Sequence, residues 1–234
     1  MARGKFIVIE GLDGSGITTQ TEYLRTWCQK RGIDVAVTKE PTDGPAGAII
    51  KLILRHEVVG LPGESIALLF AADRSHHVAS EIEPALERGT LLVSDRYSLS
   101  SFAYQLLDVD DLDWLRAVNA KAPPPDLTIF LDVPPEACLK RMKSDAWRGL
   151  DKLQRYEELS LLTKVRSNFL SVIEILQAEG QRIVIVDGKQ DIMDIGAEVL
   201  RHVGTLTEFT GDQIPGNSDA SRQVAALIEK PALG

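Results

Sequence analysis

The sequence has little cysteine, with only 2 such residues in 234. Cys28 and Cys138 lie far apart and belong to no C-x-x-C pair, which argues against a zinc site and against a disulfide framework. Each stands among apolar residues at helical spacing, so we expect two buried thiols. The four histidines are His56, His76, His77 and His202. Apart from one adjacent pair they lack metal-ligand spacing, and we assign them no chemistry.

Long apolar runs and an excess of positive charge are also missing. No apolar stretch approaches the roughly 18 residues of a membrane span, and residues 1–11 lead directly into a predicted strand. We therefore expect neither a transmembrane helix nor a signal peptide, and a cytoplasmic protein without a membrane partner. The net charge of -8 argues against general affinity for nucleic-acid polymers, which need a basic face. Binding of a nucleotide monomer needs only a small local group of basic residues.

The chain does contain short apolar runs at regular intervals, separated by segments with helical spacing. The runs are Phe6–Ile9, Val35–Val37, Leu91–Val93, Leu127–Leu131 and Ile183–Val186. Strands that alternate with helices predict an α/β fold with a five-stranded parallel sheet. Ligands of such sheets bind beyond the carboxyl ends of the strands. Functional residues are therefore expected in residues 10–18, 39–41, 94–97, 132–135 and 187–189.

A glycine-rich loop follows the first of these strands. Gly11, Gly16 and Thr18 match the G-x-x-x-x-G-K-[ST] phosphate loop, in which backbone N–H groups and a helix N-terminus hold phosphate. The G-x-x-G-x-G spacing excludes the dinucleotide fingerprint. Ile17 occupies the position of the lysine that contacts the β- and γ-phosphates, so a glycine-rich turn without a ligand remains an alternative.

Two further segments carry residues suited to a nucleotide. Phe70 and Arg74 are four apart in residues 63–88, which we expect to form one long or broken helix that bends or restarts at Pro84. Such a phenylalanine is more often core, and such an arginine more often surface. Asp95 and Arg96 follow the third strand, where they suit Mg²⁺ and phosphate respectively, or form a structural pair.

The second half of the chain contains two segments of unusual composition. Residues 143–156 are rich in charge, typical of a solvated connection or of a basic lid over a phosphoryl-transfer site. An amphipathic helix follows, with apolar positions at Leu159, Leu162, Val165, Phe169, Val172 and Leu176. Residues 205–234 turn polar and predict a loosely attached tail, with a partner-binding helix around 224–228 as the alternative.

Together, the phosphate loop, TKEPT, LLFAADR and SDRYSLSSFAYQ resemble thymidylate kinases, which phosphorylate dTMP from ATP. The resemblance covers roughly residues 5–203. It implies a P-loop NTPase type three-layer sandwich, a homodimer, Mg²⁺ as cofactor and ATP as phosphoryl donor. We accordingly expect a kinase domain over residues 1–204, with its lid at about 143–156 and an extension at 205–234.

The resemblance also implies roles for individual residues. Thr18 and Asp95 would hold the metal, and Arg96 would clamp the dTMP phosphate and the donor. Since position 14 is a glycine, the family pattern places the catalytic arginine in the lid, at Arg148 or then Arg155. The ATP site would comprise Gly11, Leu12, Asp13, Gly14, Ser15, Gly16, Ile17, Thr18, Thr19, Arg141, Lys189 and Gln190. The dTMP site would comprise Asp13, Phe70, Arg74, Arg96, Ser101, Tyr104 and Gln105.

The sequence departs from the family pattern at two cationic positions. Ile17 replaces the phosphate-loop lysine, and Lys39 stands where arginine is more frequent. Three readings stay open: a kinase in which Lys39 or a lid cation supplies the missing charge, a nucleotide-binding homologue without useful turnover, or an ordinary enzyme disabled by an introduced change. A regulator that engages a partner is the alternative from another functional class, and a deoxynucleoside or small-metabolite kinase is a further one.

Overall fold

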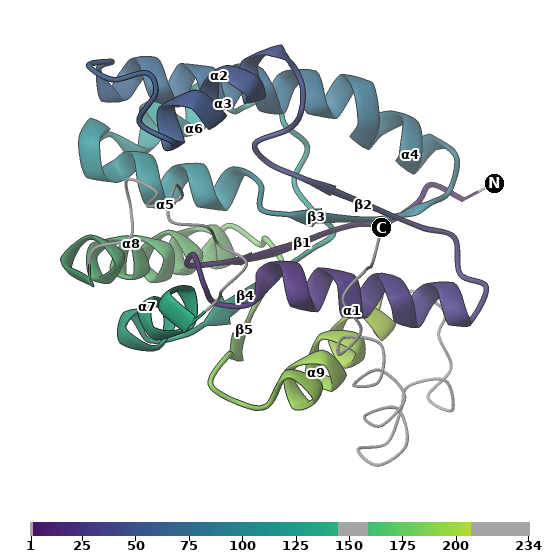
Figure 1. The fold of residues 1–234 in the computed structure, drawn as a ribbon. Coiled ribbons are helices and arrows are strands. Elements are labelled where there is room, and N and C mark those ends of the chain that lie inside the picture. Colours follow the sequence, from purple (N-terminus) through teal and green to yellow (C-terminus); the bar gives the residue numbers. More distant parts are fainter. Residues whose placement is uncertain (1, 145–158, 207–234) are drawn as a thin grey trace.

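The computed structural model describes residues 2–144 and 159–206 of the chain. Its centre is a sheet of five parallel strands in the order β2-β3-β1-β4-β5 (Figure 1). The strands are β1 (Phe6–Gly11), β2 (Val35–Lys39), β3 (Leu91–Asp95), β4 (Leu127–Asp132) and β5 (Ile183–Asp187). Each begins where the apolar runs predict, and each extends one or two residues further. The predicted α/β fold with a parallel sheet is confirmed.

Strand β1 shows why the sheet is buried on both sides. Side chains alternate between the two faces of a strand. Ile7 and Ile9 pack with one group of buried residues, whereas Phe6 and Val8 pack with another. All six residues of β1 are buried, so an uninterrupted apolar run is what this central position requires.

Helices cover both faces of the sheet (Figure 1). They are α1 (Ile17–Lys30), α2 (Pro45–Leu54), α3 (Gly63–His77), α4 (Glu83–Glu87), α5 (Ser98–Val109), α6 (Leu112–Val118), α7 (Pro135–Ser144), α8 (Leu159–Ala178) and α9 (Ile192–Gly204). Helices α1 and α9 pack on one face, and α5 and α8 on the other. Helix α3 lies against α5, with α2 beside it.

The segment 63–88, the apolar stripe of α8 and the two cysteines were also the subject of predictions. The predicted helix over 63–88 is broken, because the π-helical segment η1 (Val78–Ile82) separates α3 from α4, and Pro84 lies in the first turn of α4. The apolar stripe of α8 is buried except for Leu159, at 43% exposure. Both cysteines are buried, as expected, and burial raises the pKa of each thiol to about 12.

The predicted lid and C-terminal extension lie mostly in other parts of the chain. The lid falls almost entirely on residues 145–158 and the extension mostly on 207–234, both outside the described residues. Within the described ranges, the helices include none that is both long and apolar enough to cross a bilayer.

Candidate nucleotide-binding site

The glycine-rich loop between β1 and α1 has the backbone geometry that its sequence predicts. Gly14 and Gly16 have φ angles of 82° and 102°, a region that side chains disfavour. A Cβ atom on Gly14 would also lie 2.7 Å from the Cys138 carbonyl oxygen of α7. Residues other than glycine would therefore distort the loop. Its amides lead into the N-terminus of α1, where the helix dipole favours an anion.

Ile17 is the first residue of α1 and is buried, with only 5% exposure. It belongs to the apolar group that contains Ile7 and Ile9 of β1. Position 17 therefore contributes packing to the core and brings no positive charge to the loop. Leu12 is likewise buried, on the other side of the sheet. Leu12 and Ile17 are both predicted ATP-site residues, but with buried side chains they can offer a phosphate only their backbone N–H groups.

Thr18 and Asp95 meet at the carboxyl edge of the sheet, because β1 and β3 are neighbours. The Thr18 hydroxyl donates to Asp95 Oδ2 at 2.7 Å. A hydroxyl next to a half-buried carboxylate supplies hard oxygen ligands, which suit Mg²⁺ when phosphate and water complete the coordination. The described part of the chain has no cluster of three or more His, Cys, Asp or Glu residues arranged for a metal. The protein's own ligands therefore fit a shared magnesium site better than an all-protein cage.

Arg96 follows β3 in a left-handed conformation, with φ of 72°. Its guanidinium donates to Asp13 Oδ1 at 2.8 Å, to the Gly11 carbonyl at 3.0 Å and to Ser100 Oγ at 3.0 Å. Burial opposes its charge, but nearby anionic groups, with Asp13 prominent, hold the pKa of Arg96 above its usual value. Its carboxylate partner is thus Asp13, not the adjacent Asp95. Arg96 is thereby held in place by residues of the phosphate loop, and its positive charge lies beside that loop.

Asp13 is held by a second group as well. Its Oδ2 accepts from the Tyr104 hydroxyl at 2.9 Å. Burial, with the nearby Asp13 charge, raises the pKa of Tyr104 well above its usual value, so the ring keeps its hydroxyl proton. Asp13 therefore links the phosphate loop to β3 and to α5.

Glu10, at the end of β1, is a titratable residue that sequence reasoning did not single out. Its side chain is fully buried and accepts from the backbone N–H groups of Tyr97 and Ser100 and from the Ser100 hydroxyl. Burial raises the pKa of Glu10 to about 7, although these hydrogen bonds and Arg96 act in the opposite direction. Glu10 fixes the start of α5 and, through Ser100, supports Arg96.

Replacing Glu10 with Gln should flatten the pH dependence of stability. Because the pKa of about 7 in the folded protein exceeds the ordinary value of 4.5, the native state holds a proton between these values that the unfolded chain releases. The free energy of unfolding of the wild type should therefore fall, by on the order of 3 kcal/mol, as pH rises from about 5 to 8. Gln keeps an acceptor and carries no charge.

Urea unfolding at both ends of that pH range measures the effect. The exposed Glu22→Gln variant is the control, and it should keep the wild-type slope. An unchanged slope in Glu10→Gln would show that Glu10 does not titrate in this range.

A cavity of about 190 Å³ opens beside the phosphate loop. It brings Asp13 of the loop together with residues of β2, α2, α3, β3 and α5, over a span of 92 positions from Asp13 to Gln105. Its wall contains nine of the predicted site residues: Asp13, Lys39, Phe70, Arg74, Asp95, Arg96, Ser101, Tyr104 and Gln105. Glu40, Pro41, Leu54, Tyr97 and Ser100 complete it. Every predicted dTMP-site residue therefore lines one cavity.

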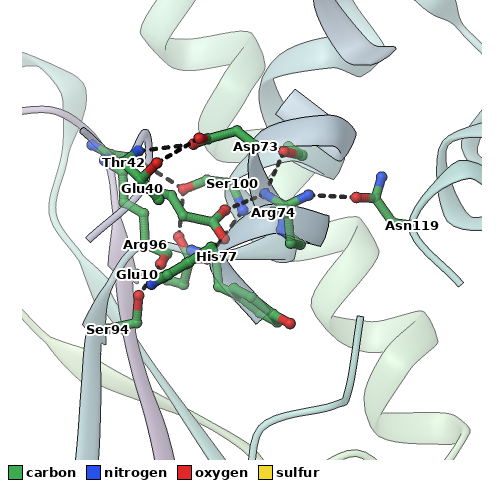
Figure 2. A network of polar contacts seen from close by, with 12 residues as sticks. Glu10, Glu40, Thr42, Asp73, Arg74, His77, Ser94, Arg96, Ser100 and Asn119 are labelled. Carbon is green, nitrogen blue, oxygen red and sulfur yellow. Dashed lines mark hydrogen bonds and ion pairs between the residues drawn. The ribbon is translucent and has the colours of Figure 1, made fainter. Parts of the chain in front are cut away.

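Arg74 is buried, with 1% exposure, unlike the usual surface arginine. Its guanidinium donates to Glu40 Oε2 at 2.6 Å and to the Asn119 side chain (Figure 2). It also donates to Ser101 Oγ at 2.8 Å. Its Nε and Gln105 Oε1 are buried and have no protein partner among the described residues. The cavity wall thus retains the Arg74 Nε donor and the Gln105 Oε1 acceptor for a ligand, and the Tyr97 hydroxyl on the same wall is likewise without a protein partner among the described residues.

A second cavity, of about 370 Å³, lies on the other side of the loop. Its wall contains Gly14, Ser15, Gly16, Thr19, Arg141 and Gln190 of the predicted ATP site. Arg141 donates to the Ser15 carbonyl at 3.2 Å and to the Gly188 carbonyl at 2.9 Å. It thereby links the loop to the turn after β5. Two cavities on either side of one phosphate loop suit a donor and an acceptor.

The remaining predicted residues are placed as follows. Lys189 is exposed after Gly188, while Arg148 and Arg155 lie outside the described residues. Sequence reasoning missed the polar residues that hold Arg74 and Arg96, namely Glu10, Glu40, His77, Ser100 and Asn119. Glu10 follows the apolar run Phe6–Ile9 and Glu40 follows β2, so both lie in the ranges where functional residues were expected, although neither was assigned a role.

This fold and site define a P-loop phosphotransferase with one cavity on each side of its phosphate loop. The family model for thymidylate kinase matches residues 9–199, and the chain belongs to the thymidylate kinase family. A probable thymidylate kinase from Pyrococcus abyssi is 44% identical over 183 residues, which are 75% of this chain and 85% of that protein. One from Pyrococcus horikoshii is 43% identical over 203 residues, covering 85% and 95%. A thymidylate kinase from Carboxydothermus hydrogenoformans is 38% identical over 202 residues, covering 84% and 95%.

Proposed function

We propose that the protein transfers the γ-phosphoryl group of ATP to dTMP, giving dTDP and ADP. The observation that carries the proposal is the 190 Å³ cavity, which joins the phosphate-loop region to Phe70, Arg74 and Gln105. The relatives quoted above are named as kinases, and the regulator alternative finds no support in the comparisons.

The base end of this cavity is suited to thymine. Thymine presents an acceptor at O4 and a donor at N3, which complement the unpaired Arg74 Nε and Gln105 Oε1. Ser101, another predicted dTMP-site residue, accepts from Arg74 and supports the same edge. Phe70 is half-buried on the cavity wall and supplies the ring on which the base stacks. Tyr104, fixed on Asp13, would disfavour a ribose 2′-hydroxyl.

The other end of the cavity is suited to phosphate. Lys39 and Arg96 lie on its wall beside Asp95 and Asp13. Phosphoryl transfer requires alignment of donor and acceptor and positive charge on the transferred oxygens. We assign these tasks to Arg96, to Lys39 and to the lid arginines Arg148 and Arg155. Thr18 and Asp95 would hold Mg²⁺, which when bound neutralises charge on the phosphates.

The larger cavity is assigned to ATP. Its wall includes loop glycines, Arg141 and Gln190. We assign the phosphates to the loop amides and the adenine to the region between Arg141 and residues 188–190. This places the donor and the acceptor on opposite sides of the loop, so that the phosphates meet at the loop amides.

We also propose a cytoplasmic homodimer. Ile49 of α2, Leu61 just before α3 and Leu68 of α3 are exposed at 42%, 38% and 49%. The neighbouring helices α2 and α3 therefore offer an apolar surface to a second copy. Light scattering on the full chain measures its mass and so tests the dimer. A purely monomeric mass at micromolar concentration would overturn it.

A coupled ADP-release assay with Mg·ATP tests the activity, and calorimetry tests the substrate. We expect dTMP to bind even if turnover is slow, because the dTMP cavity is complete without Ile17. Cytosine reverses the pattern, with a donor at N4 and an acceptor at N3, so dCMP should bind at least about a hundredfold more weakly. Failure to bind dTMP, or equal binding of dCMP, would overturn the substrate assignment.

A further inference from the structure

His77 is a fully buried histidine to which the sequence analysis assigned no chemistry. It lies on α3 three residues after Arg74, so the two side chains share a face of the helix. Its relative exposure is 0%. A buried imidazole needs partners for both ring nitrogens.

One partner is Glu40, which also binds Arg74. His77 Nδ1 lies 3.0 Å from Glu40 Oε1, while Glu40 Oε2 accepts from Arg74 at 2.6 Å (Figure 2). The two oxygens of one carboxylate, on a side chain only 3% exposed, are thus divided between the histidine and the arginine. Because a carboxylate paired with a guanidinium accepts only, the contact with Nδ1 requires a proton on that nitrogen.

The other ring nitrogen faces β2 and η1. Nε2 lies 2.7 Å from Thr38 Oγ1, whose hydroxyl also donates to Glu81 Oε2 at 2.8 Å. If Nε2 carries a proton, Thr38 Oγ1 accepts from it and donates to Glu81; if Nε2 carries none, the Thr38 hydroxyl donates to Nε2 in place of Glu81. Tyr97, on the β3 side of Arg74, keeps its proton, because burial raises the pKa of its hydroxyl. The bond from Nδ1–H to Glu40 is therefore common to both charge states of the ring.

We propose that His77 is a positioning residue for base recognition: its Nδ1–H fixes the Glu40 carboxylate, which in turn fixes the guanidinium of Arg74. This inference rests on the proposed role of Arg74 toward thymine. Without the histidine, the carboxylate can rotate in the space left behind, and Arg74 keeps only Ser101 and Asn119 as partners. Affinity for dTMP should therefore fall. Affinity for ATP should not change, because the lining of the ATP cavity includes none of these residues.

Three substitutions separate the donor at Nδ1 from the rest of the ring. The amide nitrogen of Asn occupies the position of histidine Nδ1, and that of Gln the position of Nε2. We expect His77→Leu and His77→Gln to weaken dTMP binding in calorimetry by about tenfold or more, and His77→Asn to stay within about threefold of wild type. The KM for ATP should not change in any of them. His76→Leu, one residue away and exposed, is the matched control.

The outcomes distinguish the two proposals. If the wild type does not bind dTMP, the proposed function fails. If the wild type binds dTMP and His77→Gln binds equally well, the inference is overturned. A loss of dTMP affinity that is the same in His77→Asn and His77→Gln would indicate a merely structural role and would also overturn it. Should His77→Leu fail to fold, ¹⁵N NMR of the wild-type imidazole still decides, because an unprotonated Nδ1 contradicts the inference.

Discussion

Ile17→Lys should raise kcat for dTMP phosphorylation by about a hundred- to a thousandfold. One preorganised donor at a charge-developing site is typically worth about 3 to 4 kcal/mol in the transition state. Position 17 is the first residue of α1, directly after the loop glycines, and is the position at which the phosphate-loop pattern has its lysine. The KM for dTMP should change little, because Ile17 does not line the dTMP cavity.

Ile17→Met is the control for this prediction, since methionine is also long and unbranched but uncharged. It should leave kcat near the wild-type value. A gain in kcat comparable to that of Ile17→Lys would show that the shape of the side chain, and not its charge, raises the rate. Equal kcat for wild type and Ile17→Lys would contradict the prediction. It would mean that another cation, such as Lys39 on the cavity wall, already supplies the charge. The measurement is the coupled ADP-release assay at saturating Mg·ATP.

Arg74→Met should lower the free energy of unfolding by about 3 to 5 kcal/mol, besides abolishing measurable dTMP binding. The substitution leaves the Glu40 carboxylate, with its side chain 3% exposed, without its guanidinium. Breaking a buried pair by removing one partner has this cost because an uncompensated charge stays in the interior. Urea denaturation at neutral pH measures it.

Arg116→Met provides a matched comparison. The ion pair of Arg116 with Glu179 is 34% and 43% exposed, and a pair at such exposure contributes about 0 to 1 kcal/mol. A double variant, Arg74→Met with Glu40→Gln, should recover part of the lost stability, since it removes the unpaired charge. A loss of less than about 1 kcal/mol in Arg74→Met would show that the carboxylate is neutralised by its remaining partners.

Much of this molecule could be predicted from local sequence. The uninterrupted apolar run Phe6–Ile9 defines a strand buried on both faces. The glycines at 14 and 16 occupy backbone conformations that other residues disfavour. The i, i+4 spacing of Phe70 and Arg74 brought both to one cavity wall. These features depend on short-range geometry, in which spacing along the chain sets position in space.

The partners of Arg74 were not accessible in that way. Glu40 follows β2, Ser101 belongs to α5, and Asn119 follows α6. Nothing in the local pattern distinguishes a buried arginine with three partners from a surface arginine. Its burial depends on three elements that converge on one face of α3, and convergence is a property of the packed fold.

The chain alone therefore determined the parallel sheet, the phosphate loop and the kinase family to which the motifs point, because each follows from residues close together in sequence. Only the tertiary structure decided that Ile17 points into the core, that Arg96 pairs with Asp13, and that His77 and Glu40 stand behind Arg74. Burial and the pairing of charges depend on which distant segments the sheet and its helices bring together, and a one-dimensional pattern does not record that.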